Sequence, residues 1–272
     1  RLAAVLGLLG AAGLRPPLHH VHDRADLQQW RGGSGVESQR LHVEVDREAR
    51  YELTPDLVSE AIAKHQPDIV MLCSPNNPTG TPLSLSVIEA AYSASKGIVV
   101  VDEAYAEFSH GSESSAISLL PGRERLLVSR TMSKAFAFAG ARLGYLAADP
   151  AVIDALRLVR LPYHLSALTQ AAGEVALDYQ DELLANVSRL RADREKLAQE
   201  IVALGLTVVP SDANFILFGG FAKPAAQLWK EMLERGVLIR DVGLLGYLRV
   251  TIGNEAENKK FIESLSACLG EK

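Results

Sequence analysis

The sequence predicts an α/β fold with a mostly parallel sheet in a larger domain, followed by a smaller C-terminal α+β domain. Short apolar runs of strand length alternate with amphipathic segments of helix length from about residue 50 onward. The 272 residues suffice for one large domain and a small second one. We therefore expect an atypical N-terminal segment over 1–50, the large domain over 51–160, and a linking helix with the small domain over 161–272.

The first regular part of the chain is typical of a βαβ unit. Thr54 can cap a helix whose first position is Pro55, and Pro67 ends that segment. The apolar runs 69–73 and 98–101 are bounded by turn residues, as expected of buried parallel strands. A helix near 84–95 separates them, and Gly97 ends it. The two strands should therefore lie side by side and point the same way.

The rest of the chain continues this alternation. Further strands are predicted at 126–129 and 143–147, and Pro150 opens a helix with one apolar side. A mostly helical stretch over 166–204 should link the two domains. After Gly205 the pattern changes, with predicted strands at 207–209, 214–218, 237–240 and 247–251 and predicted helices near 225–235 and 255–269. The first 40 residues give no clear strand, because glycines and prolines interrupt them.

Composition and charge argue against several classes of function. A net charge of -5, with 28 basic and 33 acidic residues, leaves no electrostatic footprint for nucleic acid or for a membrane surface. The longest apolar run, Leu2 to Leu14, is shorter than the roughly 20 residues that span a bilayer. Cys73 and Cys268 lie far apart and predict two reduced thiols in a cytoplasmic protein.

Four polar clusters follow predicted strands: 74–80, 102–105, 131–134 and 142–144. In an open parallel sheet, ligands bind at the carboxyl ends of the strands, so loops that follow neighbouring strands can meet in one site. The loop 74–80 is the most specific of the four. Its two prolines and its glycine fix a turn that presents Asn76 and Asn77 rigidly.

The cluster 131–134 combines two hydroxyls with an amine. Thr131 and Ser133 suit a phosphate, and Lys134 can act as a nucleophile toward an aldehyde if its ammonium loses a proton. Neighbouring cations help that loss, and Arg130 and Arg142 are close in sequence. The structural alternative is a solvated surface lysine.

The cluster 102–105 places a carboxylate directly after an apolar strand. Asp102 will be partly buried there and needs a cationic partner, for which a protonated pyridine nitrogen is suitable. Tyr105, three residues on, could donate a hydrogen bond to a phenolate oxygen. The structural alternative is that Asp102 caps the next helix.

From about Leu53 to the C-terminus, these motifs resemble the aspartate aminotransferase superfamily, fold type I of the pyridoxal-phosphate enzymes. The resemblance implies that the large domain binds pyridoxal 5'-phosphate. It implies these roles: Lys134 holds the cofactor covalently and moves the proton, Asp102 pairs with the pyridine nitrogen, Tyr105 and Asn77 bind the phenolic oxygen, Thr131, Ser133 and Arg142 bind the phosphate, and Arg249 clamps the substrate carboxylate.

Within that superfamily, the stretches 133–144, 160–166, 211–218 and 238–242 resemble histidinol-phosphate aminotransferases. This implies amino transfer between histidinol phosphate and 2-oxoglutarate or glutamate, in histidine biosynthesis, by a homodimer. Arg240 would be a second anion contact, or alternatively part of a salt bridge between domains. His164 is interpreted as a positioning residue. His19, His20 and His22 lie in the segment without resemblance, and we expect no metal site.

The resemblance does not extend to residues 1–50. A glycine- and serine-containing phosphate loop, an aromatic residue that stacks on the pyridine ring, and a tyrosine given to the partner subunit are not found there. The expectation is a truncated or frame-shifted segment, an incomplete large domain and a poor enzyme. Two alternatives therefore stay open. One is another fold type I enzyme, such as an aromatic aminotransferase or a threonine-phosphate decarboxylase, and the other is a non-catalytic remnant.

Overall fold

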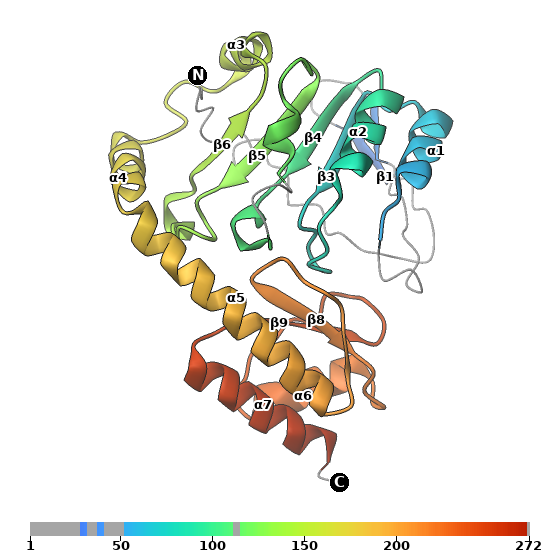
Figure 1. The fold of residues 1–272 in the computed structure, drawn as a ribbon, viewed down its shortest axis with the longest axis vertical. Helices are drawn as coiled ribbons and strands as arrows, with labels where there is room; N and C mark the ends of the chain where they lie inside the picture. Colours follow the sequence, from blue (N-terminus) through green and yellow to red (C-terminus); the bar gives the residue numbers. More distant parts are fainter. Residues whose placement is uncertain (1–27, 32–36, 41–51, 111–114, 271–272) are drawn as a thin grey trace.

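The computed structural model describes residues 28–31, 37–40, 52–110 and 115–270 (Figure 1). Strand β1 (Gln28–Arg31) pairs antiparallel with β2 (Glu37–Arg40). The expectation of no strand in this part is thus wrong. These two strands are short and mostly polar, so they lack the apolar alternation by which a strand is found in a sequence. The histidines at 19, 20 and 22 lie outside the described residues.

The larger sheet has the order β3-β4-β5-β6. Strands β3 (Ile69–Cys73), β4 (Ile98–Asp102) and β5 (Leu126–Thr131) are parallel, as the sequence predicts. The last strand, β6 (Gly144–Ala147), runs antiparallel to β5. Helices α1 (Pro55–His65) and α2 (Leu85–Ala94) pack together beside β3 and β4 (Figure 1).

Local sequence explains these elements. The hydroxyl of Thr54 accepts a hydrogen bond from the amide of Leu57 at 3.2 Å, so α1 begins at its predicted cap. At the entry to β4, a Cβ atom on Gly97 would lie 2.0 Å from the carbonyl oxygen of Asp68. Only glycine allows the two backbones to approach so closely where α2 gives way to β4.

Three helices lead to the second sheet: α3 (Pro150–Val159), α4 (Ala167–Asp178) and α5 (Gln180–Ala203). The predicted helical stretch over 166–204 is confirmed, with a break at Tyr179. Helix α5 begins beside the larger sheet and then runs along the C-terminal sheet (Figure 1). In the described part of the chain, no helix is both long and apolar enough to cross a membrane.

The C-terminal sheet contains β7 (Thr207–Val208), β8 (Phe215–Gly219) and β9 (Tyr247–Thr251), all antiparallel. Helices α6 (Ala225–Glu234) and α7 (Glu255–Leu269) pack against it. The predicted strand at 237–240 is wrong, because only Arg240 bridges to Arg249. The carbonyl of Ile239 instead accepts a hydrogen bond from the indole of Trp229 at 2.9 Å.

A separate apolar cluster lies where the two sheets meet. It contains residues from the segment after β4, from the loop after β5, from α5 and from the start of β8: Tyr105, Phe108, Ala135, Val187, Ala213 and Phe215. Short 3-10 helices lie between the strands of the larger sheet, and those in the described residues are η1 (Ala106–Phe108), η3 (Ala116–Leu119) and η4 (Ala139–Ala141). The junction cluster therefore fixes the surroundings of several predicted site residues.

Candidate functional site

Three predicted site residues meet at the junction of the two sheets. The side-chain amide of Asn77, in the loop after β3, donates a hydrogen bond to the hydroxyl of Tyr105 at 3.3 Å. The guanidinium of Arg249, on β9, donates to the side-chain oxygen of the same Asn77. The loop after β3, the loop after β4 and the C-terminal sheet thus share one hydrogen-bonded chain, although 172 residues separate Asn77 from Arg249.

Phe215 supports this group, and sequence reasoning did not single it out. The guanidinium carbon of Arg249 lies 4.6 Å from the centre of the Phe215 ring. The edge of the Tyr105 ring meets the same phenyl ring at a centroid distance of 5.2 Å and an interplanar angle of 88°. Cation–π and edge-to-face contacts hold both side chains in fixed positions. Phe215 begins β8, two residues before a position opposite Arg249, so a register prediction could have found it.

Lys134 faces the same group. Its amine lies 5.5 Å from the centre of the Tyr105 ring. Partial burial lowers the pKa of the Lys134 amine, and the charges of Arg249, Arg142 and Arg240 lower it further. The residue as a whole is exposed. Desolvation and like charge both favour the neutral amine, which is the nucleophilic form.

Arg130, expected to help Lys134, serves another purpose. Its guanidinium binds Glu103 at 2.7 Å and Glu107 at 3.3 Å. Glu103 is only 2% exposed and also accepts hydrogen bonds from the hydroxyl of Ser115 and the amide of Ala116. Since these carboxylates neutralise Arg130, the expectation that it lowers the pKa of Lys134 is wrong. Two arginines of the C-terminal part, Arg249 and Arg240, act in its place.

Asp102 ends β4 and is half-buried. It accepts a hydrogen bond from the hydroxyl of Ser129 at 3.1 Å, and Ser129 is its neighbour in register on β5. On the other side, Asp102 pairs in register with Cys73 of β3. Burial, and then the charge of Asp102, raise the pKa of the Cys73 thiol to about 12. The thiol therefore stays neutral, and Asp102 supplies the negative charge at this end of the sheet.

The three predicted phosphate-binding residues lie in adjoining loops. The hydroxyl of Thr131 donates to the carbonyl of Leu143 at 3.3 Å and accepts from the amide of Ser133 at 3.1 Å. The amide of Met132 also donates to the carbonyl of Leu143, at 3.0 Å. Arg142 has a left-handed backbone with φ of 54° and an exposed side chain. The hydroxyl of Thr131 thus braces the loop that carries Ser133 and Lys134.

Four cations of this region lack an acidic partner. Within residues 52–110 and 115–270, no carboxylate forms an ion pair with Lys134, Arg142, Arg240 or Arg249. The Nε atom of Arg249 is moreover buried, and no described residue accepts a hydrogen bond from it. Clustered cations repel one another, and a bound anion offsets that repulsion, so this arrangement suits an anion. Guanidinium groups suit carboxylates and phosphates alike.

His164 stands apart from this group. It lies in the segment between α3 and α4, and among the described residues its Nε2 atom is buried with no hydrogen-bond partner. No contact described for this part of the chain links it to Lys134 or Arg249. The positioning role expected for His164 stays a prediction. In the same described ranges, no group of three or more histidine, cysteine or acidic side chains could hold a metal ion.

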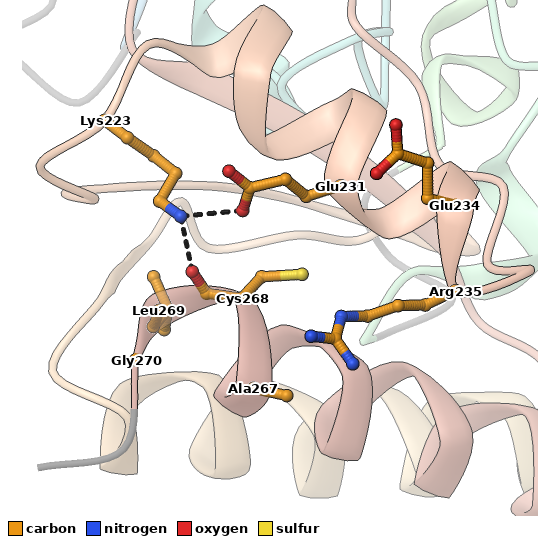
Figure 2. A pocket seen from close by; sticks show the side chains of 8 residues that line it. All are labelled: Lys223, Glu231, Glu234, Arg235, Ala267, Cys268, Leu269 and Gly270. Carbon is orange, nitrogen blue, oxygen red and sulfur yellow. Dashed lines mark hydrogen bonds and ion pairs between the residues drawn. The ribbon is translucent and has the colours of Figure 1, made fainter.

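A separate pocket lies between α6 and the end of α7 (Figure 2). Lys223 extends into it and binds Glu231 at 2.7 Å and the carbonyl oxygen of Cys268 at 2.5 Å. That carbonyl belongs to the last turn of α7, where a cation satisfies free acceptors and the helix dipole. Lys223 therefore stabilises a helix end, and its charge is already paired.

Histidinol-phosphate aminotransferases are among the known proteins that are similar to this chain. A histidinol-phosphate aminotransferase from Paenarthrobacter aurescens is 57% identical over 205 residues, which cover 74% of this chain and 55% of that protein. The histidinol-phosphate aminotransferase of Thermobifida fusca is 53% identical over 262 residues, which cover 96% of this chain and 68% of that protein. This chain therefore spans between about half and two thirds of the length of the curated relatives that it matches.

Solved structures share the fold. The histidinol-phosphate aminotransferase of Sinorhizobium meliloti, in complex with pyridoxal-5'-phosphate, superposes with a TM-score of 0.70 at 25% identity. The match covers 80% of this chain and 62% of that one. The family of class I and II aminotransferases matches residues 31–265, which include both sheets and every predicted site residue. The chain thus belongs to the class I and II aminotransferase family.

Proposed function

We propose that this chain carries the pyridoxal-phosphate site of an aminotransferase that moves an amino group between histidinol phosphate and 2-oxoglutarate or glutamate. One observation carries the proposal. Lys134, Asn77, Tyr105 and Arg249 come from four distant parts of the chain and meet in one group. The names of the relatives support the substrate assignment.

The residues present fit the cofactor. Its aldehyde needs an amine that is neutral near physiological pH, and the pKa of Lys134 is lowered. Its pyridine nitrogen needs a carboxylate, which Asp102 supplies at the end of β4. Its phosphate and the substrate anions need donors, and the four cations that form no ion pair with a described carboxylate would provide them. The buried Nε of Arg249, which no described residue accepts from, is a donor kept ready for an anion.

The chain's own residues then divide the work. Bound pyridoxal phosphate supplies an electron-withdrawing ring that stabilises negative charge on the substrate carbon. Asp102 would keep the ring nitrogen protonated, and the hydroxyl of Tyr105 and the amide of Asn77 would orient the phenolic oxygen. Lys134 would hold the cofactor, and its amine would move the proton between substrate and cofactor carbons. Ser133, Thr131 and Arg142 would hold the phosphate group.

In this proposal, Arg249 and Arg240 bind different anionic groups of the substrates. Arg249 is fixed over Phe215 and bound to Asn77, which suits the carboxylate that glutamate and 2-oxoglutarate share. Arg240 is exposed and bridges to Arg249 only through its backbone, with N–O distances of 2.8 and 2.9 Å. Its free side chain can therefore reach the phosphate ester of histidinol phosphate.

Cofactor attachment is the first test. We expect the purified chain to develop the absorbance of lysine-bound cofactor on titration with pyridoxal phosphate. Borohydride reduction and peptide mapping should then find the cofactor on Lys134. Lys134→Ala should abolish the tag, while Lys223→Ala, which removes a paired lysine, should leave it unchanged. A tag on another lysine with Lys134 unmodified contradicts the proposal, and a chain that binds no cofactor favours a non-catalytic remnant.

Substrate preference is the second test. Arg240→Ala should weaken the binding of histidinol phosphate by about tenfold or more, because one charge-assisted contact is lost, and it should weaken the binding of glutamate less. Equal losses for both substrates would point to a structural role for Arg240. The unmodified chain should also prefer histidinol phosphate over aromatic amino acids and over threonine phosphate. Release of carbon dioxide from threonine phosphate would instead identify the chain as a decarboxylase.

We further propose a cytoplasmic homodimer, with a division into a cofactor domain over 51–160 and a linking helix with the small domain over 161–272. Separate hydrophobic cores in the two sheets support the division. Large apolar side chains exposed between α3 and α5 support a partner subunit: Leu158, Val159, Leu161, Tyr163, Leu168 and Val175. Sedimentation analysis should give twice the mass of the chain, and a monomer at micromolar concentration contradicts the dimer.

A further inference from the structure

Arg194 of α5 has the largest fully buried side chain of the described residues, with 2% of its surface exposed. Taking a guanidinium out of water is costly unless its donors are all satisfied. The donors of Arg194 all have partners. Its carboxylate neighbours are not close, buried ones, because Asp212 lies 3.8 Å away and Glu195, at 3.2 Å, is itself half-exposed. Backbone carbonyls accept hydrogen bonds from the buried end of Arg194. A helix that only lay on the surface would not need such contacts.

Those carbonyls belong to the two halves of the molecule. A single nitrogen of Arg194, Nη1, donates to the carbonyl of Phe108 at 3.1 Å and to the carbonyl of Ala213 at 2.8 Å. Phe108 ends η1, three residues after Tyr105, and Ala213 lies two residues before Phe215. The other nitrogen, Nη2, contacts the ring of His110, which binds Asp212 at 2.7 Å.

The same junction carries the loop that holds Asn77. The amide of Asp212 donates to the carbonyl of Gly80 at 2.8 Å. Arg194 thus bonds directly to two segments on which the site depends, the one after β4 with Tyr105 and the one before β8 with Phe215. The second of these segments in turn binds the loop that ends at Gly80, through the amide of Asp212. Helix α5, which begins beside the larger sheet and then runs along the C-terminal sheet (Figure 1), places Arg194 at that point.

We propose that Arg194 is a positioning residue for substrate binding. It holds the C-terminal sheet at the distance from the larger sheet at which Arg249 reaches Asn77 and Phe215 meets Tyr105. This inference rests on the proposed function. Lys134, Asp102 and the phosphate-binding residues belong to the larger sheet, and none of the contacts described for Arg194 involves them, so the attachment and the phosphate contacts of the cofactor would depend on Arg194 less than substrate binding does. Substrate carboxylates do depend on it, because Arg249 comes from the other sheet.

The test separates substrate binding from cofactor binding. In the chain loaded with pyridoxal phosphate, Arg194→Gln should raise KM for glutamate and for 2-oxoglutarate by the same factor, about tenfold to a hundredfold, as expected for a binding group displaced by about 1 Å. The value of kcat should change less, and the affinity for pyridoxal phosphate should fall by a smaller factor than KM rises, since Lys134, Asp102 and the phosphate-binding residues keep their contacts and only Tyr105 and Asn77 are affected.

Two variants serve as controls. Arg194→Lys keeps a charged donor, and one nitrogen already serves both carbonyls here, so its KM should lie between those of the unmodified chain and the Gln variant. The Lys variant also provides the KM measurement if the Gln variant does not fold. Arg189→Gln removes the same charge from α5 at a position that is 54% exposed, and it should leave KM unchanged. A Lys variant as impaired as the Gln variant would contradict the bridging role.

A measurement without cofactor completes the test. Hydrogen exchange in the cofactor-free chain should be faster in Arg194→Gln over residues 208–215, which include the amide of Asp212 that bonds across the junction. Unchanged exchange, or a KM that stays constant while cofactor affinity and melting temperature fall, overturns the inference. If the unmodified chain binds no cofactor, the proposed function fails, and the exchange result still decides whether Arg194 holds the junction.

Discussion

Asp102 is the residue whose charge the proposed chemistry needs most. Asp102→Asn keeps the shape of the side chain and an oxygen that accepts the hydrogen bond of Ser129, so the fold should survive. It removes the charge that holds the ring nitrogen protonated. We expect turnover to fall by about two to three powers of ten, or about 3–4 kcal/mol in the transition state, with the cofactor still attached. Near-normal turnover in steady-state assays would show that the assignment of Asp102 is wrong.

Lys134 predicts a pH dependence with a definite sign. Its pKa is lowered by burial first and by Arg249 next, so the neutral amine is present at lower pH than for an ordinary lysine. The rate of cofactor capture should therefore rise with pH and level off below the usual lysine range. Arg249→Gln removes one positive charge and should move that rise to higher pH. Stopped-flow absorbance checks this, and an unchanged profile in the variant contradicts the assigned cause.

At the same scale, the sequence predicted which strand ends carry the candidate site residues, but not which side chains touch. Lys134, Asp102 and Asn77 each follow a strand of the larger sheet, so topology alone brings them to one edge. The sequence predicted the cations near Lys134 less well. Arg130 is close in sequence but turns to Glu103, whereas Arg249 and Arg240 approach from the other sheet. That distinction depends on side-chain direction and on packing between domains, which no local pattern contains.

Among the elements, apolar periodicity located strands β3, β4 and β5 and the long helices, because each buries one face against a core. It did not give the direction of β6, since an apolar run reads the same for parallel and antiparallel pairing. The segment 237–240 has strand-like composition but only one bridging residue, because Trp229 takes the carbonyl of Ile239. Side-chain competition for a backbone group is set by tertiary structure.

Gly80 shows how two loops constrain each other, the one after β3 and the one before β8. Its φ of 81° is left-handed, and a Cβ atom would lie 2.2 Å from the hydroxyl oxygen of Ser211. Gly80→Ala should destabilise the fold by about 1–3 kcal/mol from backbone strain, and further through the displaced Ser211. Gly122→Ala is the matched control, with a φ of 74° but nothing within 4 Å of the added atom. Equal losses in thermal unfolding would show that the contact with Ser211 is unimportant.

On the scale of the whole molecule, two sheets with separate cores meet through one helix and one junction. The positive charges that line this junction come from both sides: Lys134 and Arg142 from the larger sheet, Arg240 and Arg249 from the smaller one. Like charges brought together across a junction oppose its closure. An anion bound between them removes that repulsion, so ligand binding and the mutual placement of the sheets are coupled.

This coupling predicts that phosphate stabilises the cofactor-free chain. A ligand that binds only the folded state at a hundred times its Kd adds about 2.7 kcal/mol to the free energy of unfolding, so the melting temperature should rise with phosphate concentration. Sodium chloride at equal ionic strength should have a smaller effect. Arg249→Gln and Arg142→Gln should each reduce the phosphate effect, because each removes a cation without an acidic partner. Arg189→Gln should not, since its charge lies on the exposed side of α5.

Phosphate also stabilises proteins generally by exclusion from their surface, and that effect would raise the melting temperature of all four chains equally. Equal rises measured by differential scanning calorimetry would therefore contradict an anion site at the junction.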